Sequence, residues 1–399
     1  MLFSDSDFVA SPCLSPDGTL LAFQTWSHPD MPWDETQIRV AGFDGLSLTG
    51  LRLIKQETPG SLVQPQFNAR GDLYFIADWS NWWNLYRVSA RALQADCRAE
   101  PLLPVAAEFC PPQWQIGQHH YDFFDDRHLL VSVNRECFWE LALLDQKNGE
   151  MTPLQSGLGL LENVFCQAGG VFFVAATATA DPALQRINLQ LSGPVSGPEV
   201  LYKSRTLPLL EAEGISAPEH FSCTGTGGES AYGIFYPPCN PAYRAPADTL
   251  PPLLVNVHGG PTSSARASFN PAVQFWTSRG FAVLDVNHRG SSGYGRSFRH
   301  RLYGNWGEMD VEDVLAAVQH LLTTERVAAE KVAIRGSSAG GYAVLAALVQ
   351  SDLFSAGTCC YGISDLALLA AQTHKFESRY VEQLIGPWPE AAALYRQRS

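Results

Sequence analysis

The chain has 399 residues, of which 17% are charged and 11% are aromatic. This length exceeds one ordinary hydrophobic core, so we expect two domains, and the low charge content favours large buried cores over disorder. The net charge of -13 at pH 7, with no basic run, argues against a nucleic-acid partner and is interpreted as a source of solubility.

The first half of the chain, to about residue 210, consists of short apolar runs that each follow a turn signal. Ser15–Gly18 has Pro and Gly where a tight turn favours them, and the strand-like Leu20–Phe23 follows. Similar units begin at Asn68, Asp125 and Ala168. A turn-and-strand unit repeated every 40 to 55 residues or so predicts β-propeller blades, of which about four are visible.

An aromatic cluster, Trp79–Trp83, lies in this half. We interpret it as packing between blades, although it would also suit the lining of a substrate channel. The acidic residues of this half, including Glu136 and Glu140, show no pairing pattern, and we expect them to be solvated.

The second half changes period after a junction at residues 205–250, which is rich in Pro and polar residues. Apolar strands are predicted at Leu253–Val257, Phe281–Val286 and Val332–Ile334, with an amphipathic helix from Asp310 through Leu322 between the last two. Apolar strands that alternate with helices predict a doubly wound, mostly parallel α/β sheet covered on both faces.

The pentapeptide Gly336–Gly340 has the pattern G-x-S-x-G, with Ser338 at its centre. It lies between the last predicted strand and a helix-forming run, Tyr342–Leu348. In this context the pattern predicts a nucleophile elbow, a tight turn that exposes the serine hydroxyl at the C-terminal edge of a sheet. The pattern alone is weak in a chain with this much Gly and Ser, so the prediction depends on its flanks.

A serine nucleophile also needs donors aimed at the oxyanion that forms on the attacked carbonyl. His258–Pro261 directly follows a predicted strand, and its glycines allow a backbone N–H to face a substrate. We therefore predict that the N–H groups of Gly260 and Ala339 form an oxyanion hole. Taken alone, His-Gly-Gly-Pro is equally compatible with a plain tight turn.

In this fold the acid and the base follow the serine in the chain. His258 precedes Ser338, so we predict that it anchors its loop and is not the base. After Ser338 the sequence holds one histidine, His374, a few acids such as Asp365, and a single further predicted strand, Gly357–Tyr361. A triad needs more strand ends than that to carry its acid and base, so we expect both to be missing from this chain.

Taken together, these segments resemble the prolyl oligopeptidase family of serine peptidases, in particular its acylaminoacyl-peptidase and dipeptidyl-aminopeptidase-like members. The resembling segments are His258–Pro261, Trp276–Val283, Asn287–Gly295, Trp306–Gly307, Gly336–Gly341, Tyr361–Asp365 and, in the first half, Ser15–Gly18 and Trp82–Tyr86. The resemblance implies a propeller that caps an α/β-hydrolase domain, and hydrolysis of short peptides that enter between the two. It implies the same roles for Ser338, Gly260 and Ala339.

The resemblance also implies that the chain is truncated at both ends, because the family has more propeller blades and carries its acid and base in a C-terminal stretch. We therefore expect an incomplete β-propeller cap over residues 1–210 and the N-terminal part of an α/β-hydrolase catalytic domain over residues 211–399. The isolated chain is then expected to be incomplete as an enzyme. A non-catalytic peptide- or protein-binding remnant and an esterase with the same elbow remain alternatives.

No apolar stretch reaches the length of a membrane span, and Met1–Asp7 lacks the regions of a secretory signal. The nine cysteines have no metal-ligand spacing, and Cys359 and Cys360 are adjacent. We expect reduced, mostly buried thiols in a cytoplasmic protein, with no metal or other cofactor and no membrane partner. Neither the oligomeric state nor the preferred cleavage site follows from the sequence.

Overall fold

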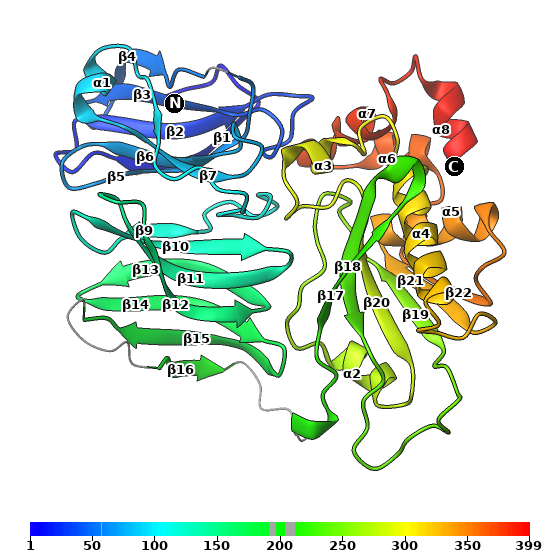
Figure 1. The fold of residues 1–399 in the computed structure, drawn as a ribbon. Coiled ribbons are helices and arrows are strands. Elements are labelled where there is room, and N and C mark those ends of the chain that lie inside the picture. The colour runs from blue at the N-terminus through cyan, green and yellow to red at the C-terminus, as the bar shows by residue number, and fades with distance from the viewer. Residues whose placement is uncertain (57, 191–196, 204–211) are drawn as a thin grey trace.

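The computed structural model describes residues 1–56, 58–190, 197–203 and 212–399. Figure 1 shows the two halves beside each other, a series of β-sheets from the first half and one larger sheet with helices from the second. The predicted domain boundary at residues 210 and 211 falls within 204–211, outside the described residues.

Among its described residues, the first half forms four antiparallel sheets of four strands each, and the strands of a sheet are consecutive in the chain. The first sheet holds β1 (Phe8–Leu14), β2 (Leu20–Trp26), β3 (Gln37–Phe43) and β4 (Leu48–Leu53). The second holds β5 (Leu62–Phe67), β6 (Leu73–Ala77), β7 (Asn84–Val88) and β8 (Glu100–Pro101), with helix α1 (Ala90–Gln94) before the last strand.

The third sheet holds β9 (Tyr121–Phe123), β10 (His128–Arg135), β11 (Phe138–Asp145) and β12 (Met151–Leu158). The fourth holds β13 (Leu160–Gln167), β14 (Gly170–Thr177), β15 (Ala180–Asn188) and β16 (Glu199–Lys203). The predicted turn at the start of the repeat is present, because Gly18 has φ 71° and its N–H donates to the Ser15 carbonyl at 2.8 Å. The sheets lie one below another in Figure 1, a propeller-like arrangement that agrees with the repeat in the sequence.

The second half forms one mixed sheet of six strands in the order β17-β18-β20-β19-β21-β22. Their bounds are β17 (Glu219–Thr224), β18 (Ser230–Tyr236), β19 (Leu253–Val257), β20 (Ala282–Asn287), β21 (Val332–Ser337) and β22 (Ala356–Cys360). The last four are parallel, as predicted. The interpretation of residues 205–250 as a junction is wrong over residues 219–236, where β17 and β18 form a hairpin that pairs antiparallel with β20.

Helices cover both faces of this sheet, as predicted. Val255 of β19 packs in the apolar cluster that includes α4 and α5, whereas its neighbour Leu254 packs in the cluster that includes α2. The described helices of the second half are α2 (Pro271–Thr277), α3 (Arg296–His300), α4 (Met309–Thr323), α5 (Ala339–Gln350), α6 (Leu366–Gln372), α7 (Tyr380–Ile385) and α8 (Ala392–Arg398). Short 3-10 turns lie at Ala212–Gly214, Thr226–Gly228 and Lys375–Glu377.

A buried ionic network joins the halves. The expectation of solvated acids is wrong for Asp34, Asp78 and Glu108, whereas the Glu136 side chain is 63% exposed. Asp78, at the end of β6, is fully buried and lies 2.6 Å from Nη2 of the equally buried Arg299 in α3. Arg296 binds the same carboxylate at 3.1 Å. Asp34 and Glu108 of the first half are buried as well. Each of the three also has a partner in the second half of the chain: Arg299 for Asp78, the Tyr303 hydroxyl for Asp34 and the Gly295 N–H for Glu108. No local pairing pattern reveals partners at such separations.

The aromatic cluster Trp79–Trp83 packs in two directions. Trp79 stacks edge-on against Tyr86 of its own sheet, with ring centroids 4.8 Å apart. Trp83 lies under the guanidinium of Arg299, whose central carbon is 4.1 Å from the ring centroid. The cluster is therefore packing, as interpreted, but its partners are its own sheet and helix α3 of the other half.

Candidate active site

The predicted site residues lie where the order of the sheet reverses. The chain passes from β19 to β20 on one side, and then to β21 on the other side of β19. Such a switch point leaves a crevice at the carboxyl ends of the two adjacent parallel strands. Val257 of β19 pairs with Gly336 of β21, so the segments that follow them leave the sheet side by side.

Ser338 lies at the turn between β21 and α5. Its backbone has φ 55° and ψ -123°, a combination that L residues rarely adopt. The residue is exposed, and its N–H donates to the Cys360 carbonyl of β22 at 3.1 Å. Its hydroxyl makes no hydrogen bond within the described part of the chain. The strand, sharp turn and helix predicted around Ser338 are therefore present.

The turn requires glycine at Gly336 and Gly340, because neighbouring backbone atoms leave no room there for a side chain. A Cβ on Gly336 would lie 2.2 Å from the Gly340 carbonyl oxygen, and one on Gly340 would lie 2.1 Å from the Val257 carbonyl oxygen. Both contacts are with backbone atoms, which cannot move aside as the end of a side chain would. The elbow is thus pressed against the end of β19, next to the predicted oxyanion segment.

Gly259 and Gly260 lie beside the serine. A Cβ on Gly259 would be 3.6 Å from Cβ of Ser338. Gly260 has φ 124°, in the region that favours glycine, and its N–H donates to no acceptor among the described residues. Ala339 is the first residue of α5, where an N–H has no partner within the helix. Both predicted donors therefore have N–H groups that the fold has not already used.

His258 is held by both of its ring nitrogens. Nδ1 lies 2.8 Å from the Gly259 carbonyl oxygen, and Nε2 lies 2.7 Å from the Ser291 hydroxyl. The ring also stacks on His288, with centroids 4.7 Å apart. Burial lowers the pKa of His258 and lowers that of His288 to about 3. These contacts agree with an anchoring role for His258 and leave neither nitrogen free to act as a base.

His374 and Asp365 follow Ser338 in the chain but were not predicted to be the base and the acid. Both side chains make other contacts. His374 has a side chain that is 68% exposed, and its Nε2 lies 3.8 Å from Glu377. Asp365 caps helix α6, because its carboxylate accepts the Leu368 N–H at 2.9 Å. Neither side chain bonds to Ser338 or to His258.

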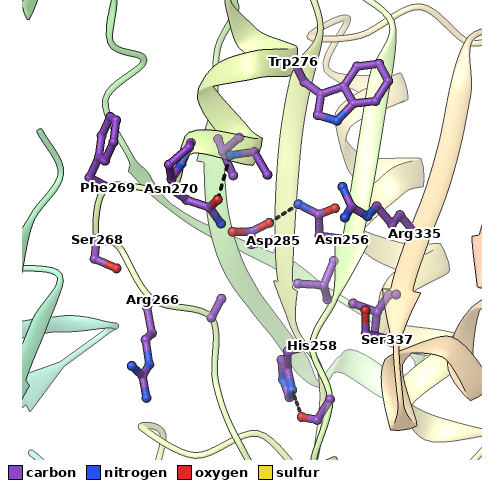
Figure 2. Close-up of a pocket in the computed structure, with 18 residues that line it drawn as sticks. Asn256, His258, Arg266, Ser268, Phe269, Asn270, Trp276, Asp285, Arg335 and Ser337 are labelled. Atoms are coloured by element: carbon purple, nitrogen blue, oxygen red, sulfur yellow. Dashed lines mark hydrogen bonds between the residues drawn. The ribbon is translucent and has the colours of Figure 1, made fainter. Parts of the chain in front are cut away.

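A cavity of about 440 Å³ opens beside the elbow, on the face of the sheet that carries α2 (Figure 2). The ends of β19, β20 and β21 and residues 265–273 line it, and Ser337 is part of the lining. On its wall Asn256 Nδ2 donates to Asp285 Oδ1 at 2.6 Å, and burial raises the pKa of Asp285 to about 6. The sequence prediction missed this pair. Both residues interrupt apolar strands, and they become partners only once β19 and β20 are aligned.

Within residues 1–56, 58–190, 197–203 and 212–399, no group of three or more His, Cys, Asp and Glu side chains is arranged to hold a metal ion. The described helices include none that is both long and apolar enough to cross a membrane.

Comparison with known proteins finds a family match within the α/β half. Residues 267–399 match the sequence profile of the prolyl oligopeptidase family, a family of peptidases. A solved puromycin-hydrolyzing peptidase of Mycobacterium tuberculosis is 35% identical and superposes with a TM-score of 0.93. That match covers 100% of this chain and 60% of the solved one, so this chain spans about three fifths of its relative's length.

Curated relatives match over shorter stretches. Dipeptidyl aminopeptidase BIII of Pseudoxanthomonas mexicana is 36% identical over 139 residues, which are 35% of this chain and 20% of the relative. The acylamino-acid-releasing enzyme of Rattus norvegicus is 41% identical over 109 residues, 27% of this chain and 14% of the relative. The resemblance carried by the motifs around Ser338 is thereby confirmed.

Proposed function

We propose that the protein is a serine peptidase that hydrolyses short peptides through an acyl-enzyme formed on Ser338. The observation that carries this proposal is the exposed serine, held in a strained turn beside Gly259 at the switch point of a parallel sheet. In the proposal, residues 1–210 are the β-propeller cap and residues 211–399 belong to the catalytic domain. Peptides enter between the two.

The chemistry assigned to the site is acyl transfer. The Ser338 hydroxyl gives up its proton to a base and its oxygen bonds to the carbonyl carbon of the peptide. The negative oxygen of the tetrahedral intermediate accepts hydrogen bonds from the N–H groups of Gly260 and Ala339. Losing one such donor typically raises the activation barrier by about 3–4 kcal/mol. The C–N bond then breaks, the amine leaves with a proton from the acid form of the base, and water releases the acyl group.

The positive end of a helix supports the same centre. Helix α5 is 12 residues long and begins directly after Ser338, so its dipole favours negative charge at that end. We assign none of His258, His374 and Asp365 to the proton transfers, because their side chains make other contacts. In this proposal the base and the acid, like further blades of the propeller, come from outside residues 1–399.

The substrate class rests on the relatives. Their names describe a puromycin-hydrolyzing peptidase, a dipeptidyl aminopeptidase and an acylamino-acid-releasing enzyme. These names differ in the group that is released, so we propose short peptides as the class and assign no cleavage-site preference.

Labelling with a fluorophosphonate probe tests the nucleophile. We expect the product of the complete open reading frame to be labelled at Ser338, and residues 1–399 alone to react more slowly. Ser338→Ala should abolish labelling, whereas Ser337→Ala, a matched change at the neighbouring serine, should preserve it. Labelling that persists in Ser338→Ala would overturn the proposal, as would rapid labelling of both serines.

Substrate comparison separates the alternatives. A peptidase should hydrolyse aminoacyl-p-nitroanilides in preference to p-nitrophenyl esters, and an esterase should show the opposite preference. A folded protein that binds peptides, resists the probe and hydrolyses neither substrate would be a binding protein.

A further inference from the structure

We infer that Trp114 of the first half and Tyr380 of α7 are positioning residues that fix the segment His258–Ser263, called here the oxyanion loop. They act through Thr262, two residues after the proposed oxyanion donor Gly260. The role in catalysis rests on the proposed function. The hydrogen bonds of Trp114 and Tyr380 with Thr262, called here the clamp, do not.

Thr262 has three polar groups, and these two aromatic side chains bind all of them. The indole Nε1–H of Trp114 donates to the Thr262 carbonyl oxygen at 2.6 Å. The Thr262 N–H donates to the Tyr380 hydroxyl oxygen at 3.3 Å, and the hydroxyl groups of the two residues lie 2.6 Å apart. Thr262 is 1% exposed and Tyr380 is 3% exposed, so water does not substitute for these bonds.

The two anchors come from opposite halves of the chain. Trp114 lies in the connection between β8 and β9, and Tyr380 is the first residue of α7. Trp33 of the first half packs against both rings, with centroids 4.4 Å from Trp114 and 5.5 Å from Tyr380. The anchors are therefore part of one aromatic cluster and have little freedom to swing away from the loop.

The rest of the oxyanion loop is also tied down, with one exception. The Gly259 carbonyl lies within reach of His258 Nδ1, and the Ser263 carbonyl accepts the Ser292 N–H at 2.8 Å. Gly260, between these fixed points, has an N–H with no acceptor among the described residues. An oxyanion donor is effective when it is pre-oriented and unpaired, and the contacts of Thr262 supply that orientation on the C-terminal side of Gly260.

Conservative variants separate the hydrogen bonds from the packing. Trp114→Phe removes the indole N–H and keeps an aromatic ring in the cluster. Tyr380→Phe removes the hydroxyl that holds two groups of Thr262. Trp139→Phe and Tyr395→Phe are matched controls, because Trp139 lies in the third sheet and the Tyr395 hydroxyl donates instead to the Gly386 carbonyl at 3.0 Å.

The catalytic readout is the reaction of Ser338 with a fluorophosphonate, followed as the maximal inactivation rate kinact and the half-saturating concentration KI. Small misplacement of a catalytic donor costs about tenfold to a hundredfold in rate, so each variant should lower kinact about tenfold. KI should stay within about twofold, because the substrate pocket is unchanged. The controls should leave both constants at their wild-type values.

Hydrogen exchange gives a readout that needs no activity. In the full chain, mass spectrometry of peptides spanning residues 258–265 should show faster exchange in Trp114→Phe and Tyr380→Phe than in the controls. Thermal unfolding checks that each variant is folded, and the two variants back each other up if one fails to fold.

The outcomes distinguish the two proposals. Unchanged exchange in both variants overturns the clamp, whether or not Ser338 reacts. Faster exchange with unchanged kinact, or an equal loss of kinact in the controls, overturns the positioning role. Faster exchange together with a serine that never reacts would preserve the clamp and overturn the proposed function.

Discussion

Ser338 keeps a strained backbone conformation because Gly336 and Gly340, two positions before and after it, have no side chains. This part of the site is predictable from sequence, since the requirement for glycine at Gly336 and Gly340 leaves a pattern of fixed spacing. The sequence also predicted that His258 anchors its loop, because His258 precedes Ser338 whereas the base of this fold follows the serine. The contacts of Trp114 and Tyr380 with Thr262 were not predictable, because they join residues 148 and 118 positions apart in the chain.

Asp285 provides a prediction about pH and stability. Burial raises its pKa to about 6 in the folded protein, against about 3.8 for an ordinary aspartate. The folded state therefore binds the proton more tightly than the unfolded state, and stability is lost as pH rises from about 4 to about 6. Asp285→Asn keeps the shape and the acceptor for Asn256 but removes this titration. We expect the variant to gain stability relative to wild type across that window, by at most about 3 kcal/mol.

Urea unfolding at pH 4 and at pH 7 measures this difference. Asp352→Asn is the control, because Asp352 is exposed and its replacement should shift both values equally. A difference between Asp285→Asn and wild type that is the same at both pH values would show that Asp285 is not buried as a proton-binding group.

Among the elements, those with a repeated or alternating local signal were predicted, and the hairpin of β17 and β18 was not. In each sheet of the first half a turn signal lies between the first and second strands, and the parallel strands of the second half are mostly apolar runs. The hairpin carries a weaker signal, the alternation of buried Phe221 and Cys223 before a turn with two adjacent glycines. It is obscured by the neighbouring Pro-rich and polar residues, and its edge position follows only from pairing with β20.

The contact between α5 and β19 leads to a prediction in which packing and helix propensity have opposite signs. Replacing glycine by alanine inside a helix normally stabilises by about 1 kcal/mol. At Gly340 the new Cβ would lie 2.1 Å from the Val257 carbonyl oxygen and 2.7 Å from that of His258. Overpacking against backbone costs about 1–3 kcal/mol or more, so we expect Gly340→Ala to destabilise the protein despite the gain in propensity.

Denaturant midpoints measure the effect of Gly340→Ala. Gly197→Ala serves as the control, since no atom of the described residues lies within 4 Å of the Cβ it would add. A Gly340→Ala variant as stable as wild type would mean that the elbow is not pressed against the end of β19.

On the scale of the whole molecule, the contacts that join the two halves are buried and specific. One apolar cluster includes Trp33 and Trp83 of the first half together with Trp306 and Tyr380 of the second. The ionic network of Asp78 and Arg299 lies beside it, between residues 221 positions apart. No local pattern encodes a pair at that separation, which is why the sequence predicted two halves and a cap but not the interface that joins them.

A double-mutant cycle on Asp78 and Arg299 tests whether this interface contributes to stability. Arg299→Met retains an apolar stem against Trp83 but leaves the buried carboxylate with only Arg296 and the Ser61 N–H as partners among the described residues. Breaking one side of a buried pair typically costs about 3–5 kcal/mol. Asp78→Asn in the Arg299→Met background should cost much less than in wild type, giving a coupling energy of more than about 1 kcal/mol.

The exposed pair Arg326 and Glu219 is the reference for this cycle. Its atoms are 2.8 Å apart, but the side chains are 41% and 46% exposed, so its coupling should be below about 1 kcal/mol. Both cycles are measured as free energies of unfolding in urea at one pH. If the Asp78 and Arg299 changes were additive within about 0.5 kcal/mol, the network would not join the halves energetically, and the apolar cluster alone would hold them together.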